Sequence, residues 1–339
     1  MKKTAVVILN YNGSGFLKKF LPVVIEKSAH VAEIVVADNR SSDDSVRVMK
    51  ELFPEVRLIE MDKNRGYAGG YNEALKQVEA EYYILLNSDI EVTDGWIEQV
   101  TELMDSDPSI AACQPKIKDY NRREYFEYAG AAGGFIDRYG YPFCRGRIFM
   151  SLEKDLGQYD DIREIFWASG ACMFVRSGVF HELGGFDEDF FAHMEEIDFC
   201  RRAKNLGYKI MVQPSSVVYH IGGGTLPKSS ARKTYLNFRN NFSLLFKNIT
   251  EDRLLMIFVV RLFLDGIAGL KFLLEGHPAD FWSVIKAHFY FYRNLGNLKR
   301  KRKQLKHTHP DNLYQGNIVF DHYMLRKKRF SDLNDMMFE

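Results

Sequence analysis

Polar side chains follow several short apolar runs of this sequence, at positions where a strand would end. The set comprises Asn10, Asn12, Asp38, Asn87 and Asp89. Because alternate residues of an extended segment project to the same side, Asn87 and Asp89 can face one ligand. The Asp89 carboxylate is a hard oxygen donor, which suits Mg²⁺ or Mn²⁺ bound together with diphosphate oxygens. By itself the triplet 87–89 also fits an ordinary turn, since Asn and Asp favour turns.

A glycine-containing loop carries groups for the same chemistry. The loop 64–70 begins with Asn64, Arg65 and Gly66, and its three glycines lie where a helix is predicted to open. Backbone N–H groups at such a helix start can approach an anion closely. A flexible turn would have the same composition.

Two later segments add an acid cluster and a histidine. Glu195, Glu196 and Asp198 lie within four residues at the start of another predicted helix. Acids at a helix start often only interact with the helix dipole, but one of them can also take a proton from a sugar hydroxyl. His220 ends a predicted strand before a run of glycines, and a neutral imidazole there can bind a metal ion. A single histidine is more often structural.

The first hundred residues predict a scaffold for these groups. Short apolar strands alternate with helices, which is typical of a mostly parallel sheet with helices on both faces. The predicted strands are 5–9, 32–37, 56–60 and 82–86, and the predicted helices are 16–26, 43–53, 70–79 and 95–104. Because the carboxyl ends of parallel strands form the ligand-binding edge of such folds, the polar clusters are expected at one edge.

The remaining sequence divides into an irregular middle, a second ordered part and a helical region. The irregular part is 105–166; strands are predicted at 167–175, 209–212 and 216–220, and helices at 178–183, 195–206 and 233–247. An apolar stretch at 254–274 and an aromatic segment at 281–292 precede a basic cluster at 299–303. We therefore expect a catalytic domain over 1–225, a helical region over 226–306 and a tail over 307–339.

The helical region has two interpretations. Arg261, Asp265 and Lys271 interrupt its apolar stretch, which argues against a helix that crosses a membrane. An apolar helical pair followed by basic residues favours attachment to a membrane surface. The alternative is a soluble helical subdomain that packs on the catalytic domain.

Composition disfavours several classes of protein. The 339 residues carry a formal net charge of +1, so no nucleic-acid partner is expected. The four cysteines lie far apart, which favours buried free thiols over zinc sites or disulfides. The N-terminal apolar run is too short for a signal peptide, so a cytoplasmic location is expected. Lys18 stands where a dinucleotide-binding fingerprint begun at Gly13 and Gly15 requires glycine, which disfavours a nicotinamide-dependent oxidoreductase.

Taken in order, the motifs resemble those of glycosyltransferase family 2, especially its rhamnosyltransferase-like and galactofuranosyltransferase-like members. The segments that carry the resemblance are 7–12 (VILNYN), 36–39 (VADN), 64–70 (NRGYAGG), 86–89 (LNSD), 184–187 (GGFD) and 195–200 (EEIDFC). Each motif is loose, but their order and spacing are specific from the N-terminus to about residue 224. The resemblance implies a GT-A fold, which is a Rossmann-like mixed sheet flanked by helices, together with an inverting mechanism and a divalent cation.

The resemblance also implies roles for individual residues. The nucleotide-sugar donor would contact Asn10, Asn12, Asp38, Asn64, Arg65, Gly66, Asn87 and Asp89. Asp89 would hold the metal ion, with His220 and Asn87 as further ligands. Glu196 would be the catalytic base, accompanied by Asp198 in the catalytic acid cluster. The acceptor would lie near Trp167, Ser169, Gly170 and Glu195.

Two positions depart from the family pattern. Asn87 replaces the first acid of the metal motif, which removes one charge from the metal site, although rhamnosyltransferase-like members share this Asn. Glu196 replaces the more common Asp, and its longer side chain requires the base to be attached further from the acceptor.

These observations predict an inverting glycosyltransferase that takes a sugar, with rhamnose as one candidate, from a UDP-sugar or dTDP-sugar. The acceptor would be a hydroxyl of a glycan or lipid-linked glycan in cell-surface polysaccharide synthesis, at the cytosolic face of the inner membrane. The alternative is a catalytically decayed transferase scaffold that binds a sugar or lipid, and Asn87 is the residue that favours it. No feature of the sequence indicates an oligomeric state.

Overall fold

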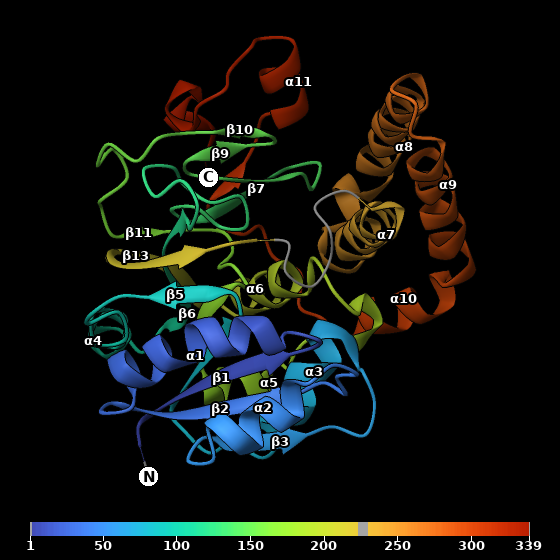
Figure 1. The fold of residues 1–339 in the computed structure, drawn as a ribbon. Coiled ribbons are helices and arrows are strands. Elements are labelled where there is room, and N and C mark those ends of the chain that lie inside the picture. Colours follow the sequence, from blue (N-terminus) through green and yellow to red (C-terminus); the bar gives the residue numbers. More distant parts are fainter. Residues whose placement is uncertain (1, 223–229, 339) are drawn as a thin grey trace.

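A computed structural model describes residues 2–222 and 230–338 (Figure 1). Its main element is a nine-stranded mixed sheet with the order β11-β13-β6-β12-β4-β1-β2-β3 and with β5 paired to β13. The strands are β1 (Thr4–Asn10), β2 (Ala32–Asp38), β3 (Arg57–Glu60), β4 (Tyr82–Asn87), β5 (Ile90–Val92), β6 (Ile110–Asp119), β11 (Arg163–Glu164), β12 (Cys172–Arg176) and β13 (Lys209–His220). β1 to β4 are parallel, as predicted, whereas β12 runs antiparallel between β4 and β6.

Helices cover both faces of this sheet, which agrees with the sequence. They are α1 (Ser14–Ser28), α2 (Ser45–Leu52), α3 (Gly66–Leu75), α4 (Glu98–Ser106), α5 (Ser177–Glu182) and α6 (Glu195–Asn205). Alternate residues of β1 enter two apolar clusters, Ala5 and Val7 on one face and Val6 and Ile8 on the other. Because both faces of the strand are buried, its sequence is a continuous apolar run. All four cysteines are buried and free, as predicted.

Residues 105–166 are more ordered than their sequence suggested. Besides β6, they contain β7 (Gly134–Asp137), β8 (Pro142–Cys144), β9 (Arg147–Ile148) and β10 (Ser151–Leu152). These strands belong to a second sheet with the order β10-β9-β8-β7-β14, whose last strand, β14 (Leu313–Tyr314), comes from near the C-terminus. Strands of two to four residues are too short to leave a clear alternation in the sequence.

The prediction of a tail over 307–339 is wrong. This segment contains β14, α11 (Ile318–Tyr323), η2 (Phe330–Asp332) and η3 (Asp335–Met337). Tyr314, Ile318 and Phe330 are buried in one of the two clusters that form the core of the catalytic domain. The aromatic ring of Phe330 lies 5.1 Å from that of Phe135 in β7. A few large apolar side chains therefore anchor a segment that is polar overall.

Four helices form the helical region, beside the catalytic domain (Figure 1): α7 (Ala231–Asn248), α8 (Glu251–Leu274), α9 (Pro278–Arg293) and α10 (Leu295–Lys303). Arg261 and Asp265 lie on the buried face of α8, 3.1 Å apart. Arg261 also donates to the carbonyl oxygen of Tyr139, between β7 and β8, at 2.7 Å. One face of α8 is thus fixed to the second sheet. The expected boundary at residue 225 lies outside the described residues.

Candidate active site

The carboxyl ends of β1, β2 and β4 lie side by side, as the sequence predicted. In the register of the sheet Asn10 pairs with Asp38, and Leu9 pairs with Asn87. The Asn10 amide donates to the Asp38 carboxylate at 3.1 Å, and the backbone N–H of Ser41 donates to its other oxygen at 2.9 Å. Asn10 and Asp38 are almost fully buried, so they fix the floor of this edge.

Asn12 joins the loops that follow β1 and β2. Its backbone is left-handed, with φ of 52°, a conformation that Asn tolerates better than most residues. Its side-chain oxygen accepts from the backbone N–H of Ser42 at 2.7 Å, and its own N–H donates to Ser41 Oγ at 2.9 Å. Asn12 therefore shapes the edge through contacts within the protein.

Asn39, which the sequence did not single out as a site residue, connects the predicted donor loop to this edge. Its amide nitrogen donates to the carbonyl oxygen of Gly66 at 2.8 Å, and its oxygen accepts from the N–H of Arg65 at 2.9 Å. Asn64 in turn accepts from the N–H of Gly66 at 2.8 Å. Gly66 has φ of 70°, and a Cβ there would lie 2.4 Å from the carbonyl oxygen of Phe191. Only glycine fits this position.

The predicted metal ligands converge at the end of β13. This strand pairs antiparallel with β5, where His220 is opposite Ile90, and so reaches the residue that precedes β5. Nε2 of His220 lies 3.1 Å from the carboxylate of Asp89 and 3.5 Å from the amide nitrogen of Asn87. His220 therefore meets two residues that lie 133 and 131 positions earlier in the sequence.

Glu127, which carries no signal in the sequence, holds the other side of the His220 ring. Its carboxylate lies 3.1 Å from Nδ1. Burial opposes the charge on the ring, but Glu127 and Asp89 together raise the pKa of His220 to about 10. The protonated ring therefore takes the place of a cation between two carboxylates. A carboxylate behind a histidine is the usual way to orient a metal ligand.

Few side chains around Asp89 and His220 could bind a metal ion. Among residues 2–222 and 230–338, no group of three or more His, Cys, Asp or Glu side chains is arranged to hold a metal ion. Glu127 faces the ring nitrogen opposite to Asp89, so the two carboxylates cannot share one ion with His220. Asp89, Asn87 and Nε2 of His220 could hold a divalent cation once the His220 ring has lost its proton, and diphosphate oxygens would have to complete the coordination.

Glu196 has the environment of a general base. It is half-buried in the first turn of α6, and one of its carboxylate oxygens is buried without a hydrogen-bond partner in the described structure. Burial raises the pKa of Glu196 to about 7. A carboxyl group with this pKa can accept a proton near neutral pH and release it again. The neighbouring Glu195 is buried, and burial followed by the charge of Glu196 raises its pKa well above its ordinary value.

Asp198 does not occupy the catalytic position that was expected. Its carboxylate is fully buried and accepts from Arg202 at 2.9 Å, from Lys247 at 3.0 Å and from Asn248 at 2.9 Å. Burial opposes its ionisation, but Lys247 and then Arg202 hold the pKa of Asp198 below its usual value. With both oxygens engaged, Asp198 anchors α6 to α7 and is unable to accept a proton from a substrate.

The residues expected near the acceptor form part of the scaffold. Trp167 is buried and donates from its indole nitrogen to the carbonyl oxygen of Phe135 at 2.9 Å. Ser169 is also buried, and its N–H donates to Gln114 at 2.9 Å. Neither side chain is available to an acceptor in this arrangement. The carbonyl oxygen of Gly170 accepts from the hydroxyl of Tyr67, in the first turn of α3.

Tyr67 links the donor loop to the acid cluster, a role that no sequence motif indicated. Burial, and then Tyr71, Glu195 and Glu196, raise the pKa of Tyr67 well above its ordinary value. Its hydroxyl is therefore neutral and lies within the electrostatic reach of both glutamates. The acid cluster and the donor loop are thus neighbours in the folded protein.

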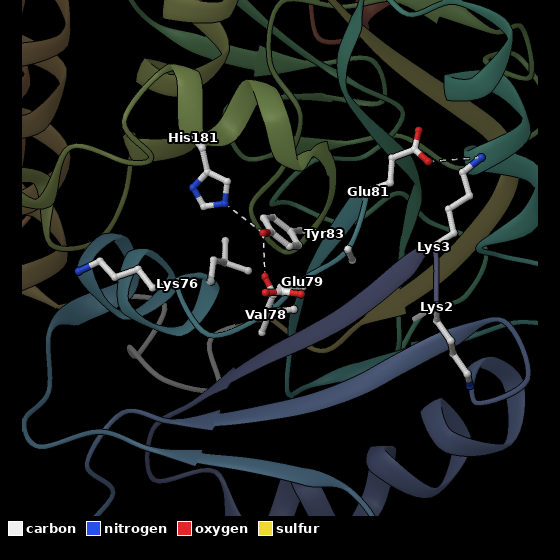
Figure 2. A pocket seen from close by; sticks show the side chains of 10 residues that line it. Lys2, Lys3, Lys76, Val78, Glu79, Glu81, Tyr83 and His181 are labelled. Atoms are coloured by element: carbon white, nitrogen blue, oxygen red, sulfur yellow. Dashed lines mark hydrogen bonds and ion pairs between the residues drawn. The ribbon is translucent and has the colours of Figure 1, made fainter.

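A surface hollow elsewhere carries none of these residues. Figure 2 shows this hollow of about 640 Å³, lined in part by Lys2, Lys3, Glu81, Tyr83 and His181. Lys3 precedes β1 and Glu81 precedes β4, so the hollow opens at the amino ends of the strands. His181 lies 3.0 Å from the Tyr83 hydroxyl. The hollow is therefore at the sheet edge opposite to Asp38 and Asp89.

Comparison with known proteins decides the family. The sequence model described as Glycosyl transferase family 2 matches residues 5–184, more than half of the chain. The chain belongs to glycosyltransferase family 2. The protein is therefore a glycosyltransferase, as its motifs predicted. The match ends before Glu196 and His220, so these two positions rest on the geometry described above.

Curated relatives of this glycosyltransferase act in glycan synthesis. It is 25% identical over 229 residues to the N-acetylglucosaminyl-diphospho-decaprenol L-rhamnosyltransferase of Mycobacterium tuberculosis, which covers 63% of this chain and 75% of the relative. It is 26% identical to the low-salt glycan biosynthesis hexosyltransferase Agl10 of Haloferax volcanii, over 70% of this chain and 74% of that one.

Solved structures confirm the fold of the glycosyltransferase. Staphylococcus aureus TarS 1–349 superposes with a TM-score of 0.53 at 17% identity, over 89% of each chain. GalNAc-T7 with UDP, GalNAc and Mn²⁺ superposes with a TM-score of 0.58 at 18% identity, over 74% of this chain and 49% of that one. The mixed sheet with flanking helices is the GT-A type that was predicted.

Proposed function

We propose that this glycosyltransferase transfers a sugar, with inversion, from a UDP-sugar or dTDP-sugar to a hydroxyl of a glycan or lipid-linked glycan. The observation that carries the proposal is Glu196, a half-buried carboxylate with an unpaired oxygen and a pKa of about 7, which neighbours Tyr67 of the donor loop. A proton acceptor and a nucleotide-binding loop are the two parts that such a transfer needs. Cell-surface polysaccharide synthesis is the process in which we place it.

The donor is proposed to bind at the carboxyl edge of the parallel strands. Asn10, Asn12 and Asp38 form the floor and wall of this edge, and Asn64, Arg65 and Gly66 begin the loop that opens α3. Two similar proteins support the choice of nucleotide. A dTDP-rhamnosyl transferase of Shigella flexneri is 24% identical over 71% of this chain, and the GalNAc-T7 structure contains UDP and Mn²⁺.

Asp89, His220 and Asn87 are the residues that would hold Mg²⁺ or Mn²⁺. The cation would supply positive charge next to the leaving diphosphate. Asn87 contributes no charge to this set, so Asp89 carries the only formal negative charge among the three. The orientation of His220 is fixed by Glu127 whether or not a cation is bound.

The reaction is proposed as a single displacement. The Glu196 carboxylate takes the proton of an acceptor hydroxyl, and that oxygen forms a bond to the anomeric carbon. The bond from this carbon to the diphosphate oxygen breaks, and its electron pair leaves with the diphosphate. Because attack and departure occur on opposite faces of the sugar, the anomeric configuration inverts.

The first experiment is a thermal-shift screen against UDP-sugars and dTDP-sugars with Mn²⁺ and Mg²⁺. We expect stabilisation by at least one nucleotide sugar in the presence of a cation, followed by slow cation-dependent release of the sugar to water. A protein that binds nucleotide sugars but never releases nucleoside diphosphate would instead be a catalytically decayed binding protein. This is the alternative that Asn87 favours.

A peripheral attachment to the cytosolic face of the inner membrane is the second part of the proposal. Within the described residues, none of the helices is long and apolar enough to cross a membrane. The outer face of α8 is nevertheless mostly apolar from Leu255 to Leu274, where Lys271 is the exposed charge. Its exposed apolar members, here named the α8 stripe, are Leu255, Met256, Val259, Leu262, Phe263, Ile267, Leu270, Leu273 and Leu274. Monomeric proteins rarely expose so long an apolar surface.

Neighbouring features support a lipid surface as the partner of the α8 stripe. Exposed Tyr323, Met324 and Leu325 at the end of α11 extend it, since Lys271 of α8 lies 5.5 Å from the Tyr323 ring. Residues 253–306 contain eleven Lys and Arg against three Asp and Glu, although the whole chain has a net charge of only +1. An exposed apolar stripe in a basic region favours anionic membranes. The rhamnosyltransferase relative has a lipid-linked acceptor in its name.

Flotation of the full chain with vesicles of phosphatidylglycerol and phosphatidylcholine tests this attachment. Phe263→Glu together with Leu270→Glu should abolish flotation and leave the circular dichroism spectrum unchanged. Leu52→Glu is the matched control, because Leu52 is an exposed leucine on α2. Equal flotation of all three proteins would refute the lipid surface, and a loss of self-association in the stripe variant alone would indicate a second copy of the chain instead.

We propose the same division of the chain that the sequence predicted, with one change. The catalytic domain comprises 1–225, and the helical region 226–306 provides the membrane surface. The described part of the C-terminal segment, 307–338, packs on the catalytic domain through Tyr314, Ile318, Phe330 and Leu333, and we assign it to that domain.

A further inference from the structure

The segment that precedes the acid cluster has a strained backbone. Phe191, His193 and Met194 have φ values of 63°, 70° and 72°, which place three non-glycine residues in the left-handed region. Such residues are uncommon singly and rare in a group. Glu196 lies two residues after Met194, in the first turn of α6. Neighbouring groups must therefore hold this backbone, or Glu196 would change its direction.

Asn240 of α7 holds the segment from one side. Its side chain is buried, and its amide nitrogen lies 2.9 Å from the carbonyl oxygen of Phe190, 2.9 Å from that of Ala192 and 2.7 Å from that of His193. The preceding Arg239 donates to the Asn240 side-chain oxygen at 2.7 Å, which fixes the orientation of the amide. The Asn240 side chain thus binds the carbonyl groups of Ala192 and His193, and it shares that of Phe190 with Arg239, which donates to it at 2.7 Å.

The donor loop holds the same segment from the other side. The carbonyl oxygen of Phe191 accepts from the backbone N–H of Tyr67 at 2.6 Å and from that of Ala68 at 3.2 Å. Gly66 lies against the same carbonyl, where a Cβ would be only 2.4 Å away. The segment 190–194 therefore lies between α7 and the start of α3.

We propose that Asn240 is a positioning residue for sugar transfer, which aims Glu196 at the acceptor by holding the segment 190–194. The proposal rests on Glu196 as the base. Without the amide of Asn240, the left-handed residues can relax toward the backbone region that L-residues prefer. Glu196 would then turn away from the acceptor, while Asp38 and Asn64 would still bind the nucleotide. The loss should therefore appear in the catalytic step and leave nucleotide binding nearly unchanged.

The test compares two adjacent buried asparagines on α7. Asn240→Ala removes the contacts with the segment 190–194. Asn241→Ala is the control, because Asn241 donates to the carbonyl oxygen of Gly140 and accepts from Arg261. Its contact with this segment is a long one, 4.0 Å to the sulfur of Met194. Both changes remove buried hydrogen bonds, so both are expected to lower the melting temperature.

The measured quantities are the rate of Mn²⁺-dependent hydrolysis and the Kd of the matching nucleoside diphosphate. The substrate is dTDP-rhamnose, or whichever sugar of a UDP and dTDP panel the wild type hydrolyses fastest. Asn240→Ala should lower the rate at saturating donor about 100-fold, which is the order of loss caused by misplacing a reacting group by about 1 Å. Its nucleotide Kd should stay within about threefold of wild type, and Asn241→Ala should stay within about threefold in both quantities.

An isosteric change separates hydrogen bonding from packing. Asn240→Asp keeps the shape of the side chain but has no N–H groups to donate to the three carbonyls. It should be as slow as Asn240→Ala. An Asn240→Asp variant with wild-type rate would refute the proposal, as would equal rate losses in Asn240→Ala and Asn241→Ala.

A double variant separates this inference from the proposed function. If Asn240 acts through Glu196, then Glu196→Gln and Asn240→Ala together should be no slower than Glu196→Gln alone. Multiplied losses would show that Asn240 acts on another step and would overturn the inference. Full activity in Glu196→Gln would overturn the assigned base, which is a different result from a fast Asn240→Ala enzyme.

Discussion

Replacement of Glu196 by Gln should remove the catalytic base and at the same time remove a source of instability. The side chain keeps its shape and loses only its charge and one acceptor oxygen, so donor binding should change little. General bases contribute about 10²- to 10⁴-fold in rate, and we expect a loss in this range for nucleotide-sugar hydrolysis or transfer.

The pKa of about 7 determines the pH dependence of the wild-type enzyme. The carboxylate is the active form, so the rate should rise about tenfold per pH unit below pH 7 and level off above it. An ordinary glutamate would already be ionised at pH 6 and would give a flat profile from pH 6 upward. The slope between pH 5.5 and 7 should disappear in Glu196→Gln.

The same shift affects stability with a sign that can be worked out. The folded-state pKa of Glu196 lies above the unfolded value of 4.5, so the folded protein binds more protons between these two pH values. The contribution of Glu196 to the stability therefore falls as the pH rises from 4.5 to 7. A shift of this size corresponds to at most about 3 kcal/mol, and partial exposure of the side chain reduces it to about 1–2 kcal/mol.

Glu196→Gln does not lose stability as the pH rises through 7, because the amide of glutamine does not ionise. The variant should melt a few degrees above wild type at pH 8 and at the same temperature at pH 4.5. Scanning calorimetry at both pH values, with Leu52→Gln as a surface control, measures the difference. A variant with full activity, or one that is less stable than wild type at pH 8, would refute the environment that we assign to Glu196.

Three further changes test other parts of the site. Gly66→Ala should lower the melting temperature and weaken nucleotide binding at least tenfold, because a Cβ would lie 2.4 Å from the carbonyl oxygen of Phe191. Calorimetric titration with UDP and dTDP measures the change in Kd. An unchanged Kd would contradict the close packing of Gly66 against Phe191. Asp198→Asn should cost about 3–5 kcal/mol of unfolding free energy, since it leaves Arg202 without a buried counter-charge and Lys247 with Asp187 alone. A stable but inactive variant in urea unfolding would restore a catalytic role. Asp89→Asn should weaken the Mn²⁺ dependence of nucleotide binding at least tenfold and leave cation-free binding unchanged, and an unaltered Mn²⁺ titration would exclude Asp89 as a ligand.

The edge at which Asn10, Asp38 and Asn87 meet could be predicted from the sequence because its signals are local. A continuous apolar run ends at Asn10 and another ends at Asp38, and parallel strands necessarily place such ends together. The glycines at 64–70 likewise indicate that the backbone there packs closely against another group, because glycine has no Cβ. This signal is also local. The order and spacing of the family motifs made these segments specific. A single turn-like triplet such as 87–89 is not specific by itself.

The parts that could not be predicted depend on contacts between distant segments. Asp198 has the same chemistry as Glu196 in the sequence, but Lys247 and Arg202 neutralise it, and one of these partners lies 49 residues away. Trp167 and Ser169 looked available to an acceptor, but the second sheet and Gln114 cover them. The fold of 307–339 is set by a few buried aromatic rings, which give no periodic pattern.

The sequence by itself indicated the family through the order of its motifs, and it determined the parallel half of the sheet and the polar edge of these strands. Apolar periodicity and turn-forming residues are local properties, and they suffice for the strands and their edge. Only the tertiary structure decided which acid is free to act. Burial raises the pKa of Glu196, ion pairs lower that of Asp198, and Glu127 orients His220 across 93 residues of sequence. These effects arise from desolvation and charge at distances of a few ångströms, which are set when the chain is folded.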